Sequence, residues 1–485
     1  MFPQFTAIPR LERITFADMG RRANIILPQV TIEGMAAKGK AFGRAKDEKI
    51  VFVPFAAPGD NVDVRVTKKR SKFYEGVIEK IHRPSEERVT PRCVHFGTCG
   101  GCKWQHINYE TQLKGKQQEV IENLKRIGQV IPKEVYEILG AVEQYDYRNK
   151  MEFSFSDSKW LTQEEIQSNA TFNRNALGFH KPQMWDKVID LKECHLQGPL
   201  SNDIRLFCKE EAERQGLKFF NLRGGYGDLR TLMIRTTQKG QMMVLIQFCD
   251  ASKEAIEAYL KAIHHRFPDL HSILYTINKK ANDTLYDQEI HRYAGADYIE
   301  EEMEGLRFAI DAKSFYQTNS LQAQRLYSIA RDFAELKSTD IVYDLYTGTG
   351  TIAQFIARSV QKVVGVESVP EAIAKAKENA TINGIDNVSF EVGDMRKVFN
   401  EDFIQRHSKA DVVITDPPRD GMHADVIAQL LALNAERIVY VSCNSATQAR
   451  DLQLLSVQYD TVKSQAVDMF PQTHHVENVV LLKRR

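Results

Sequence analysis

Cysteine is scarce in this chain: seven of its 485 residues are cysteine, too few for a protein held together by disulfides. No run of eighteen apolar residues occurs, so no segment is predicted to cross a membrane. The first 22 residues carry scattered charges and lack the apolar core of a secretory signal. A net charge of +1 excludes a bulk polycation, and a hydrophobic content of 43% excludes a disordered chain. We expect a cytoplasmic protein of several domains, without membrane contact and without an obligate protein partner.

After an extension at residues 1–22, residues 23–88 have the pattern of a small β-barrel. Short apolar strands alternate with turns, and Val62, Val64 and Val66 alternate with polar residues. Five such strands in so short a segment indicate a closed barrel of the oligonucleotide-binding (OB) fold. Residues 1–90 carry 17 Lys and Arg against 11 Asp and Glu, and the loop 68–74 interleaves four cations with two aromatic residues. Cations suit phosphates and rings suit bases, so the barrel is predicted to bind RNA.

Three cysteines close together in the sequence indicate a metal site. They form a C-x5-C-x2-C run that contains two glycines, which let the backbone fold around a metal. Of the remaining candidates for a fourth ligand, Cys208 and Cys249 have the apolar surroundings of packing residues, whereas Cys194 is in a loop. This spacing is typical of an iron–sulfur cluster, with zinc or no metal as the alternatives. The predicted ligands are Cys93, Cys99, Cys102 and Cys194.

Residues 89–310 are predicted to form a central α+β domain that carries this metal site. A long amphipathic helix is expected from about Tyr109 to Ile127, within a segment (105–130) that we expect to pack on the C-terminal domain. Strands and helices then mix. The expected strands are 242–248 and 273–277, and the expected helices are 202–215 and 253–264.

From residue 311 the pattern changes to strands that alternate regularly with helices. Such alternation predicts an α/β domain with a doubly wound, mostly parallel sheet over residues 311–485. The expected strands are 341–345, 363–367, 388–392, 411–415 and 437–441, with a closing strand near 476–482.

The first two of these strands end in a pattern typical of a site for a nucleotide-like ligand. Gly348 and Gly350 allow a tight turn, and Glu367 ends the next strand, where a carboxylate accepts hydrogen bonds from ribose hydroxyls. A dinucleotide site would need a third glycine, which is missing after Gly350. We therefore predict S-adenosylmethionine, which has a ribose but no phosphate, with Asp394 near its adenine.

Two later strands lead to the residues expected to carry the chemistry. Residues 438–441 deliver Cys443 at the carboxyl end of a strand, where sheets of this type bind ligands. The preceding strand ends in Asp416-Pro-Pro-Arg419, whereas enzymes that methylate exocyclic amines carry an aromatic residue at the position of Arg419. This difference argues against amine methylation and leaves a carbon acceptor open, for which Cys443 supplies the thiolate that it would need.

Five motifs in this order resemble the RNA uridine-C5 methyltransferase family. They are Phe315-Tyr-Gln-Thr-Asn319, Asp344-Leu-Tyr-Thr-Gly348, Asp416-Pro-Pro-Arg419, Ser442-Cys-Asn444 and His474-His-Val-Glu477. With the barrel (a TRAM domain in that family) and four cysteines in front, residues 25–485 are most similar to the branch that methylates 23S ribosomal RNA and carries a 4Fe-4S cluster. The resemblance implies a class I, Rossmann-like methyltransferase sheet.

The resemblance also implies roles for individual residues. Cys443 is then the nucleophile and Glu477 the base. The residues around the cofactor are then Gln317, Tyr346, Thr351, Glu367, Asp394 and Asp416. Thr351 and Asp394 stand where some relatives carry asparagine.

In the implied reaction, the thiolate of Cys443 adds to C6 of uracil and makes C5 nucleophilic. C5 takes the methyl group from S-adenosylmethionine, and Glu477 removes the C5 proton so that the thiolate can leave. His474 and His475 are alternative bases. Two other functions remain open at this point: the same reaction on transfer RNA, and RNA binding without catalysis by an iron–sulfur protein.

Overall fold

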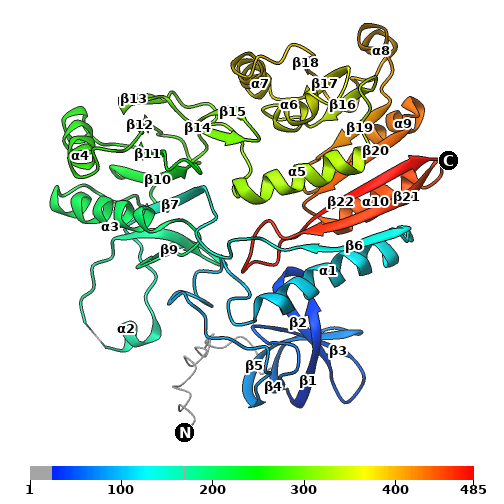
Figure 1. Cartoon of the computed structure of the whole chain (residues 1–485). Coiled ribbons are helices and arrows are strands. Elements are labelled where there is room, and N and C mark those ends of the chain that lie inside the picture. Colours follow the sequence, from blue (N-terminus) through cyan, green and yellow to red (C-terminus); the bar gives the residue numbers. More distant parts are fainter. Residues whose placement is uncertain (1–24, 169) are drawn as a thin grey trace.

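The computed structural model describes residues 25–168 and 170–485, which fold into three parts (Figure 1). In Figure 1 a small barrel lies at the bottom, a sheet with helices on one face lies at the upper left, and a larger sheet with helices on both faces forms the C-terminal part at the right. The predicted extension at residues 1–22 lies outside the described residues. Within the described ranges, no helix is long and apolar enough to cross a membrane.

The N-terminal part is a closed five-stranded barrel. Its strands are β1 (Ile26–Ala36), β2 (Lys40–Arg44), β3 (Ile50–Pro54), β4 (Asn61–Lys69) and β5 (Phe73–Arg83), and a 3-10 turn, η1 (Ala37–Gly39), joins the first two. They close in the order β1-β2-β3-β5-β4. Val62 and Val64 are fully buried, because every second side chain of β4 points into the barrel.

The central part is a seven-stranded sheet. Its elements are β7 (Lys150–Ser156), α2 (Gln163–Gln167), β8 (Ala176–Lys181), β9 (Met184–Asp190), α3 (Pro199–Arg214), β10 (Leu229–Thr236), β11 (Met242–Phe248), α4 (Lys253–Arg266), β12 (Ser272–Ile277) and β13 (His291–Gly295), followed by the hairpin β14 (Tyr298–Met303) and β15 (Leu306–Asp311). Ile204 of α3 and Leu260 of α4 are buried against one face of the sheet. On the other face, Met233 and Leu245 belong to a core shared with the C-terminal part. The two parts are therefore joined by one hydrophobic core.

The C-terminal part is an eight-stranded sheet between two layers of helices. Its elements are α1 (Tyr109–Arg126), β6 (Glu134–Leu139), α5 (Ser320–Ala334), β16 (Ile341–Leu345), α6 (Thr351–Ala357), β17 (Lys362–Glu367), α7 (Pro370–Ile382), β18 (Val388–Val392), α8 (Glu401–His407), β19 (Val412–Thr415), α9 (Ala424–Leu433), β20 (Arg437–Ser442), α10 (Ser445–Leu455), β21 (Tyr459–Val467) and β22 (Glu477–Arg484). The strand order is β18-β17-β16-β19-β20-β22-β21-β6. Helices α5, α6 and α7 cover one face, and α1, α8, α9 and α10 cover the other. The predicted α/β sheet is confirmed.

Helix α1 and strand β6 correct the predicted domain boundaries. Strand β6 pairs in parallel with β21 at the edge of the C-terminal sheet. Helix α1 lies beside α10, where Val120 and Leu124 are buried and the Asn123 amide donates a hydrogen bond of 2.8 Å to the Ser445 hydroxyl. The predicted central domain, residues 89–310, is thus interrupted by a segment of the C-terminal sheet; the sequence pattern indicated this packing only for the helix.

Trp104 attaches the barrel to the rest of the protein. Its side chain is 1% exposed and packs with Ala57 of the barrel and Ile107. The indole nitrogen donates a hydrogen bond of 3.2 Å to the carbonyl of Gly39, in the turn between β1 and β2.

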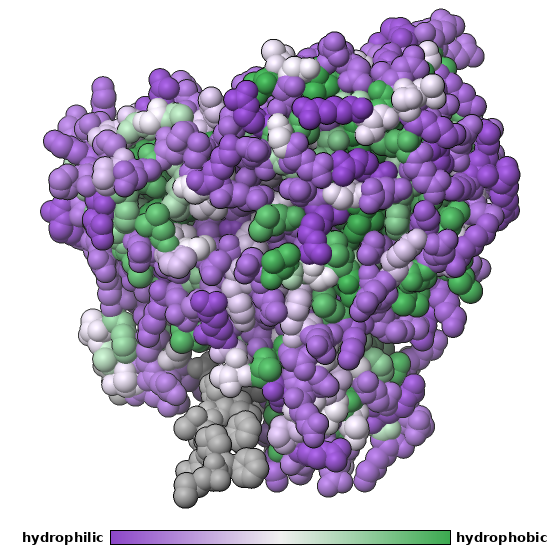
Figure 2. Space-filling view, in the orientation of Figure 1, coloured by the Kyte–Doolittle hydropathy of each residue, from purple (hydrophilic) through white to green (hydrophobic). Residues whose placement is uncertain are grey.

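The molecular surface is mostly hydrophilic on the face shown in Figure 2, where apolar side chains gather mainly over the C-terminal part.

Candidate active site

The carboxyl ends of β16, β19 and β20 meet at one edge of the C-terminal sheet. The three strands are parallel and in register, with Asp344 opposite Ile414 and Ile414 opposite Val439. Asp416 and Cys443 directly follow β19 and β20, and Asp344 of β16 is near enough to Asp416 for its charge to raise the pKa of that buried carboxyl group. This is the edge at which open α/β sheets bind their ligands.

Cys443 and Glu477 lie side by side because β22 runs antiparallel to β20. The pairing sets Ser442 opposite Asn478, and Cys443 and Glu477 are the next residues along these two strands. Burial raises the pKa of the Cys443 thiol, and the nearby charge of Glu477 contributes to this rise. Glu477 is only 6% exposed, so the pair faces a site that is largely shielded from water.

Three carboxyl groups at this edge ionise near neutral pH. Burial raises the pKa of Asp344 and of Asp416 to about 7, and it raises the pKa of Glu477 to about 8. The charge of Asp344 adds to the effect on Asp416, and the charge of Asp416 adds to the effect on Glu477. A carboxyl group with such a pKa can take up a proton at physiological pH, as a general base must.

Arg419 supplies positive charge to this site, a role that the sequence analysis missed. Burial and the neighbouring carboxylates raise the pKa of Cys443 to about 11, and Arg419 opposes them through its charge and a hydrogen bond to the thiol. The carbonyl of Arg419 accepts hydrogen bonds from Asn444 Nδ2 at 2.9 Å and Thr447 Oγ1 at 3.0 Å. These bonds anchor its loop to the start of α10. The signal in the sequence was the cation that ends the motif Asp416-Pro-Pro-Arg419.

The turn after β16 is shaped by unusual backbone conformations. Gly350 has a φ of 76°, which glycine adopts easily, and Tyr346 has a φ of 61°, which is strained for a residue with a side chain. Asp344 accepts hydrogen bonds from the Thr347 hydroxyl and, at 3.0 Å, from the Ala353 amide. Its other oxygen, Oδ1, is buried and has no hydrogen-bond partner among the described residues. The turn therefore keeps a buried acceptor available for a ligand.

Glu367 is oriented toward this turn. Its Oε2 accepts a hydrogen bond of 3.2 Å from the Gly348 amide, and its Oε1 accepts bonds from the amides of Ser368 at 2.7 Å and Val369 at 3.1 Å. The carboxylate is thus held between the turn after β16 and the start of α7. Burial raises the pKa of Tyr346 to about 12, with smaller contributions from the charges of nearby acids, Glu367 among them.

The remaining predicted cofactor residues, Gln317, Thr351 and Asp394, differ in their exposure and in the groups that they contact. Burial and the charge of Asp416 raise the pKa of Tyr327, and a hydrogen bond with the Gln317 side chain opposes this rise. Thr351 begins α6 and is 8% exposed. Asp394 is more accessible and forms an ion pair of 2.8 Å with Arg396. A contact between Asp394 and adenine would compete with this ion pair.

His474 and His475 lie close to Glu477 with their ring centroids 4.2 Å apart. Burial and nearby cations such as Arg419 together lower the pKa of both imidazoles to about 4. Both are therefore neutral at physiological pH. They are also weaker bases than Glu477, whose pKa is about 8.

The four predicted cluster cysteines meet in one region. Cys99 and Cys194 each raise the pKa of Cys93, and the same three thiols act on Cys102. In the part of the chain that the structure describes, no group of three or more His, Cys, Asp or Glu side chains is arranged to hold a metal ion. The four predicted ligands therefore lie in one region, but the described residues do not support the predicted cluster.

The loop 68–74 of the barrel differs from its prediction. Tyr74 is 5% exposed and donates a hydrogen bond of 2.9 Å to Asp47, because β5 turns this residue into the barrel. Phe73 packs edge to face on Phe52, with ring centroids 5.6 Å apart. The prediction of base stacking is therefore wrong for Tyr74. The cations Lys69, Arg70 and Lys72 are exposed.

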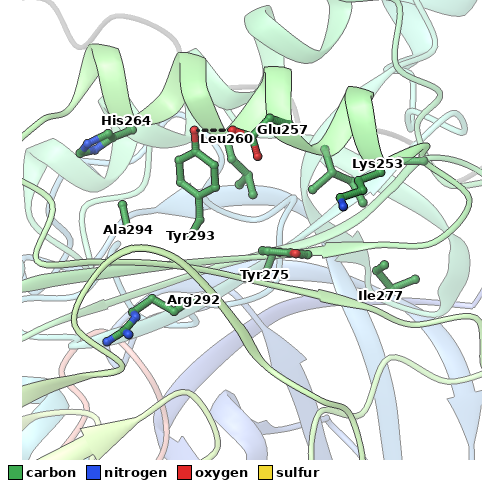
Figure 3. Close-up of a pocket in the computed structure, with 11 residues that line it drawn as sticks. Lys253, Glu257, Leu260, His264, Tyr275, Ile277, Arg292, Tyr293 and Ala294 are labelled. Atoms are coloured by element: carbon green, nitrogen blue, oxygen red, sulfur yellow. Dashed lines mark hydrogen bonds between the residues drawn. The ribbon is translucent and has the colours of Figure 1, made fainter.

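A hollow of about 670 Å³ lies in the central part, away from this edge. It separates α4 from β12 and β13, and Lys253, Tyr275 and Tyr293 line it (Figure 3). Tyr293 donates a hydrogen bond of 3.3 Å to Glu257 there. None of the predicted site residues lines this hollow, so the chemistry of the side chains points to the C-terminal sheet instead.

Comparison with known proteins gives consistent matches to this chain. The family model of tRNA (uracil-5-)-methyltransferases matches residues 287–485, and the TRAM domain model matches residues 29–78. A Porphyromonas gingivalis protein named an uncharacterized RNA methyltransferase is 54% identical over 463 residues, which cover 93% of this chain and 99% of that protein. A Bacteroides thetaiotaomicron protein of the same name is 49% identical, over 93% of this chain and 100% of that protein.

A solved structure also matches most of this chain. The crystal structure of Pyrococcus abyssi tRNA (uracil-54, C5)-methyltransferase in complex with S-adenosyl-L-homocysteine superimposes with a TM-score of 0.72 and 29% sequence identity. The match covers 94% of this chain and 100% of that one. The likeness therefore extends beyond the C-terminal sheet.

Proposed function

Because this chain belongs to the RNA uracil-5-methyltransferase family, we propose that it methylates C5 of a uridine through a covalent bond between Cys443 and C6. Glu477 then removes the C5 proton. The family depends on S-adenosylmethionine and acts on RNA. The observation that carries this mechanism is the adjacency of a thiol and a buried carboxyl group at the ends of β20 and β22.

The first step needs the thiolate of Cys443. With a pKa of about 11 in the free protein, the thiol is almost fully protonated at neutral pH. Arg419 lowers this pKa, and the positive sulfonium of S-adenosylmethionine would lower it again when bound beside these residues. The thiolate then forms a bond to C6, and the electron pair of the C5–C6 double bond moves toward the C4 carbonyl, giving an enolate.

The second and third steps take place at C5. The enolate attacks the methyl carbon, the methyl–sulfur bond breaks, and the neutral thioether leaves. Glu477 then accepts the C5 proton, the C5–C6 double bond re-forms, and Cys443 departs as a thiolate. A pKa of about 8 makes Glu477 a better proton acceptor than His474 or His475, whose pKa values are about 4. The two histidines suit contacts with the RNA beside the reacting base.

The residues around the turn after β16 suit S-adenosylmethionine. Glu367 offers a carboxylate to the ribose hydroxyls, and the free oxygen of Asp344 offers an acceptor nearby. Asp394 would contact the adenine amine after release from Arg396. The further proposed contacts are Gln317, Tyr346, Thr351 and Asp416.

We also infer that the four converging cysteines bind a 4Fe-4S cluster. Their mutual effects on pKa show that the thiols share one region, and the donor set has the four sulfurs that such a cluster takes. Apolar and aromatic neighbours, among them Tyr147 and Leu196, surround Cys102. A bound cluster would cross-link the segment 93–102 to the loop of Cys194.

We propose 23S ribosomal RNA as the substrate, because a TRAM barrel combined with four cysteines resembles the ribosomal branch of the family. Transfer RNA is the second candidate, because the similar P. abyssi protein is a tRNA (uracil-54, C5)-methyltransferase. The exposed cations at the tip of the barrel suit the phosphates of either RNA.

Mapping of 5-methyluridine in total RNA distinguishes these substrates. A strain that lacks the gene is compared with strains complemented by the wild type or by Cys443→Ala. Loss of a 5-methyluridine from 23S RNA that only the wild type restores supports the first substrate, and the same result in transfer RNA supports the second. Unchanged 5-methyluridine in both RNAs contradicts the proposed reaction.

A further inference from the structure

We propose that helix α1 positions the catalytic base through Lys116 and Gln112. These residues hold residues 468–476, called the base loop here, which connect β21 to β22 and lead directly into Glu477. The proposal rests on the proposed function. It assigns positioning residues to a helix that is far from the catalytic motifs in the sequence.

The base loop begins at a fully buried ion pair. Lys116 Nζ lies 2.5 Å from Asp468 Oδ1, and neither side chain is exposed. Lys116 also donates a hydrogen bond of 3.1 Å to the carbonyl of Phe470, and the Tyr109 hydroxyl donates one of 2.8 Å to Asp468 Oδ2. Apolar residues of similar volume often stabilise a core as well as a buried ion pair does. We therefore interpret this pair as a means of placing the loop.

Helix α1 contacts the base loop a second time at Gln472. Gln112 Nε2 donates a hydrogen bond of 3.1 Å to Gln472 Oε1. The backbone N–H of Gln472 donates one of 3.1 Å to Gln112 Oε1. Gln472 has a φ of 68° and is 3% exposed. A non-glycine residue keeps this conformation only where its surroundings enforce it. Gln112 supplies part of that enforcement.

Four consecutive carbonyl groups of the base loop accept hydrogen bonds from different segments of the chain. The donors are Asn319 Nδ2 to Met469 at 3.0 Å, Lys116 Nζ to Phe470 at 3.1 Å, the Tyr147 hydroxyl to Pro471 at 3.0 Å, and the amides of Lys103 and Trp104 to Gln472 at 2.8 and 3.1 Å. Side chains and backbone amides from other segments of the chain therefore fix the path of the base loop. Because Lys103 follows Cys102, the cysteine segment also contacts the loop that carries the base.

A matched control exists at the amino ends of two parallel strands of the same sheet, away from the carboxyl ends that form the site. Arg437, the first residue of β20, forms a buried ion pair of 2.8 Å with Asp340, which precedes β16. Their side chains are 6% and 5% exposed. Loss of this pair should affect the stability of the C-terminal part without reaching Glu477.

The test compares Lys116→Met/Asp468→Asn with Arg437→Met/Asp340→Asn. Each double variant removes both charges, so that no buried charge is left unpaired. Methyl transfer is followed with labelled S-adenosylmethionine, and proton removal is followed by tritium release from RNA that contains [5-³H]uridine. In a single turnover, with enzyme in excess over RNA, we expect methyl transfer in the first variant to change little and tritium release to slow about tenfold or more, because a small displacement of a catalytic group costs at least that much. The methylated enzyme–RNA adduct should accumulate on denaturing gels.

The control variant should release tritium at the wild-type ratio to methyl transfer. Equal slowing of the two steps in Lys116→Met/Asp468→Asn would mean that the pair is merely structural and would overturn the proposal. Gln112→Leu, of similar volume, serves as a second variant if the first does not fold. An unchanged ratio of the two steps in Gln112→Leu would also overturn it. A wild-type enzyme that forms no adduct, in contrast, contradicts the proposed function itself.

Discussion

Cys443 and Glu477 stand opposite each other where the antiparallel strands β20 and β22 meet the ligand-binding edge of the sheet. The charge of Glu477 raises the pKa of Cys443, so two negative charges at this position are unfavourable together. This arrangement suits a reaction in which Cys443 and Glu477 act one after the other. The thiolate charge disappears when its sulfur bonds to C6, and the carboxylate of Glu477 is needed only after that step.

Loss of the two residues should therefore stop the reaction at different points. Cys443→Ala should bind RNA and S-adenosylmethionine but form no adduct, because the ring is never activated. Glu477→Gln should methylate once and then stall, because an amide cannot take the C5 proton. The adduct should appear as a shifted band on denaturing gels that carries the methyl label. Normal turnover by Glu477→Gln would remove this residue from its role and direct attention to His474 and His475.

The stability of the free protein should depend on the ionisation of Glu477. Its pKa rises from 4.5 in the unfolded chain to about 8 in the folded protein, so its stabilising contribution is complete below pH 4.5 and is lost as the pH rises through about 8. Between pH 5 and pH 8.5 the wild type should lose on the order of 4 kcal/mol of stability that Glu477→Gln does not lose. Thermal unfolding of both proteins at the two pH values measures this. Parallel pH dependence of the two proteins would argue against a raised pKa.

Removal of the charge of Arg419 should make Cys443 less reactive. Arg419 lowers the pKa of the thiol, and an opposite charge at close range typically shifts a pKa by about one unit or more. Arg419→Met should therefore slow adduct formation about tenfold, whereas Arg419→Lys, which keeps the charge, should retain much of the rate. Alkylation of Cys443, followed by mass spectrometry across a pH series, reports the thiolate directly. A pH profile that is the same in Arg419→Met and the wild type would exclude this role.

Glu367 should contribute to cofactor affinity. Its carboxylate is held toward the turn after β16, and hydrogen bonds to a charged acceptor are worth about 1–3 kcal/mol. Calorimetry should show weaker binding of S-adenosylmethionine to Glu367→Ala by that amount. Glu371→Ala, which removes an exposed acid from the first turn of α7, is the control and should bind normally. Unchanged affinity in a folded Glu367→Ala protein would contradict the assignment.

The cysteine site predicts a coloured protein. Anaerobically purified enzyme should be brown and contain about four irons per chain, as a 4Fe-4S cluster requires. Cys102→Ala should lose iron, whereas Cys208→Ala, which alters a buried core cysteine of α3, should keep it. A colourless wild-type protein that contains one zinc ion would favour the alternative metal.

The sequence by itself determined the elements whose apolar pattern is local. Alternating Val62 and Val64 predicted a barrel strand, and the helix expected from Tyr109 to Ile127 is α1 (Tyr109–Arg126). The runs of β-branched residues predicted the parallel strands β16 to β20, because such strands are buried on both faces. The motifs at the ends of these strands indicated the family, since Asp416 and Cys443 directly follow recognisable strands.

Two strands of the C-terminal sheet were not recognisable from the sequence. Strand β6 is exposed along most of its length, and β21 mixes buried with polar positions, so neither has a continuous apolar run. An edge strand is identified only by the neighbour with which it pairs. The pairing of β6 with β21 joins segments that are far apart in the chain, which no local pattern encodes.

Only the tertiary structure decided how the site is assembled. The register of β22 on β20 sets Glu477 beside Cys443, and the loop after β19 brings Arg419 to the thiol. Tyr74 turned out to fill the barrel rather than face RNA. Lys116 reaches Asp468 across the layers of the C-terminal part. These relationships depend on the order and direction of strands within a sheet and on side chains from distant segments, whereas propensity and periodicity act between near neighbours in the chain.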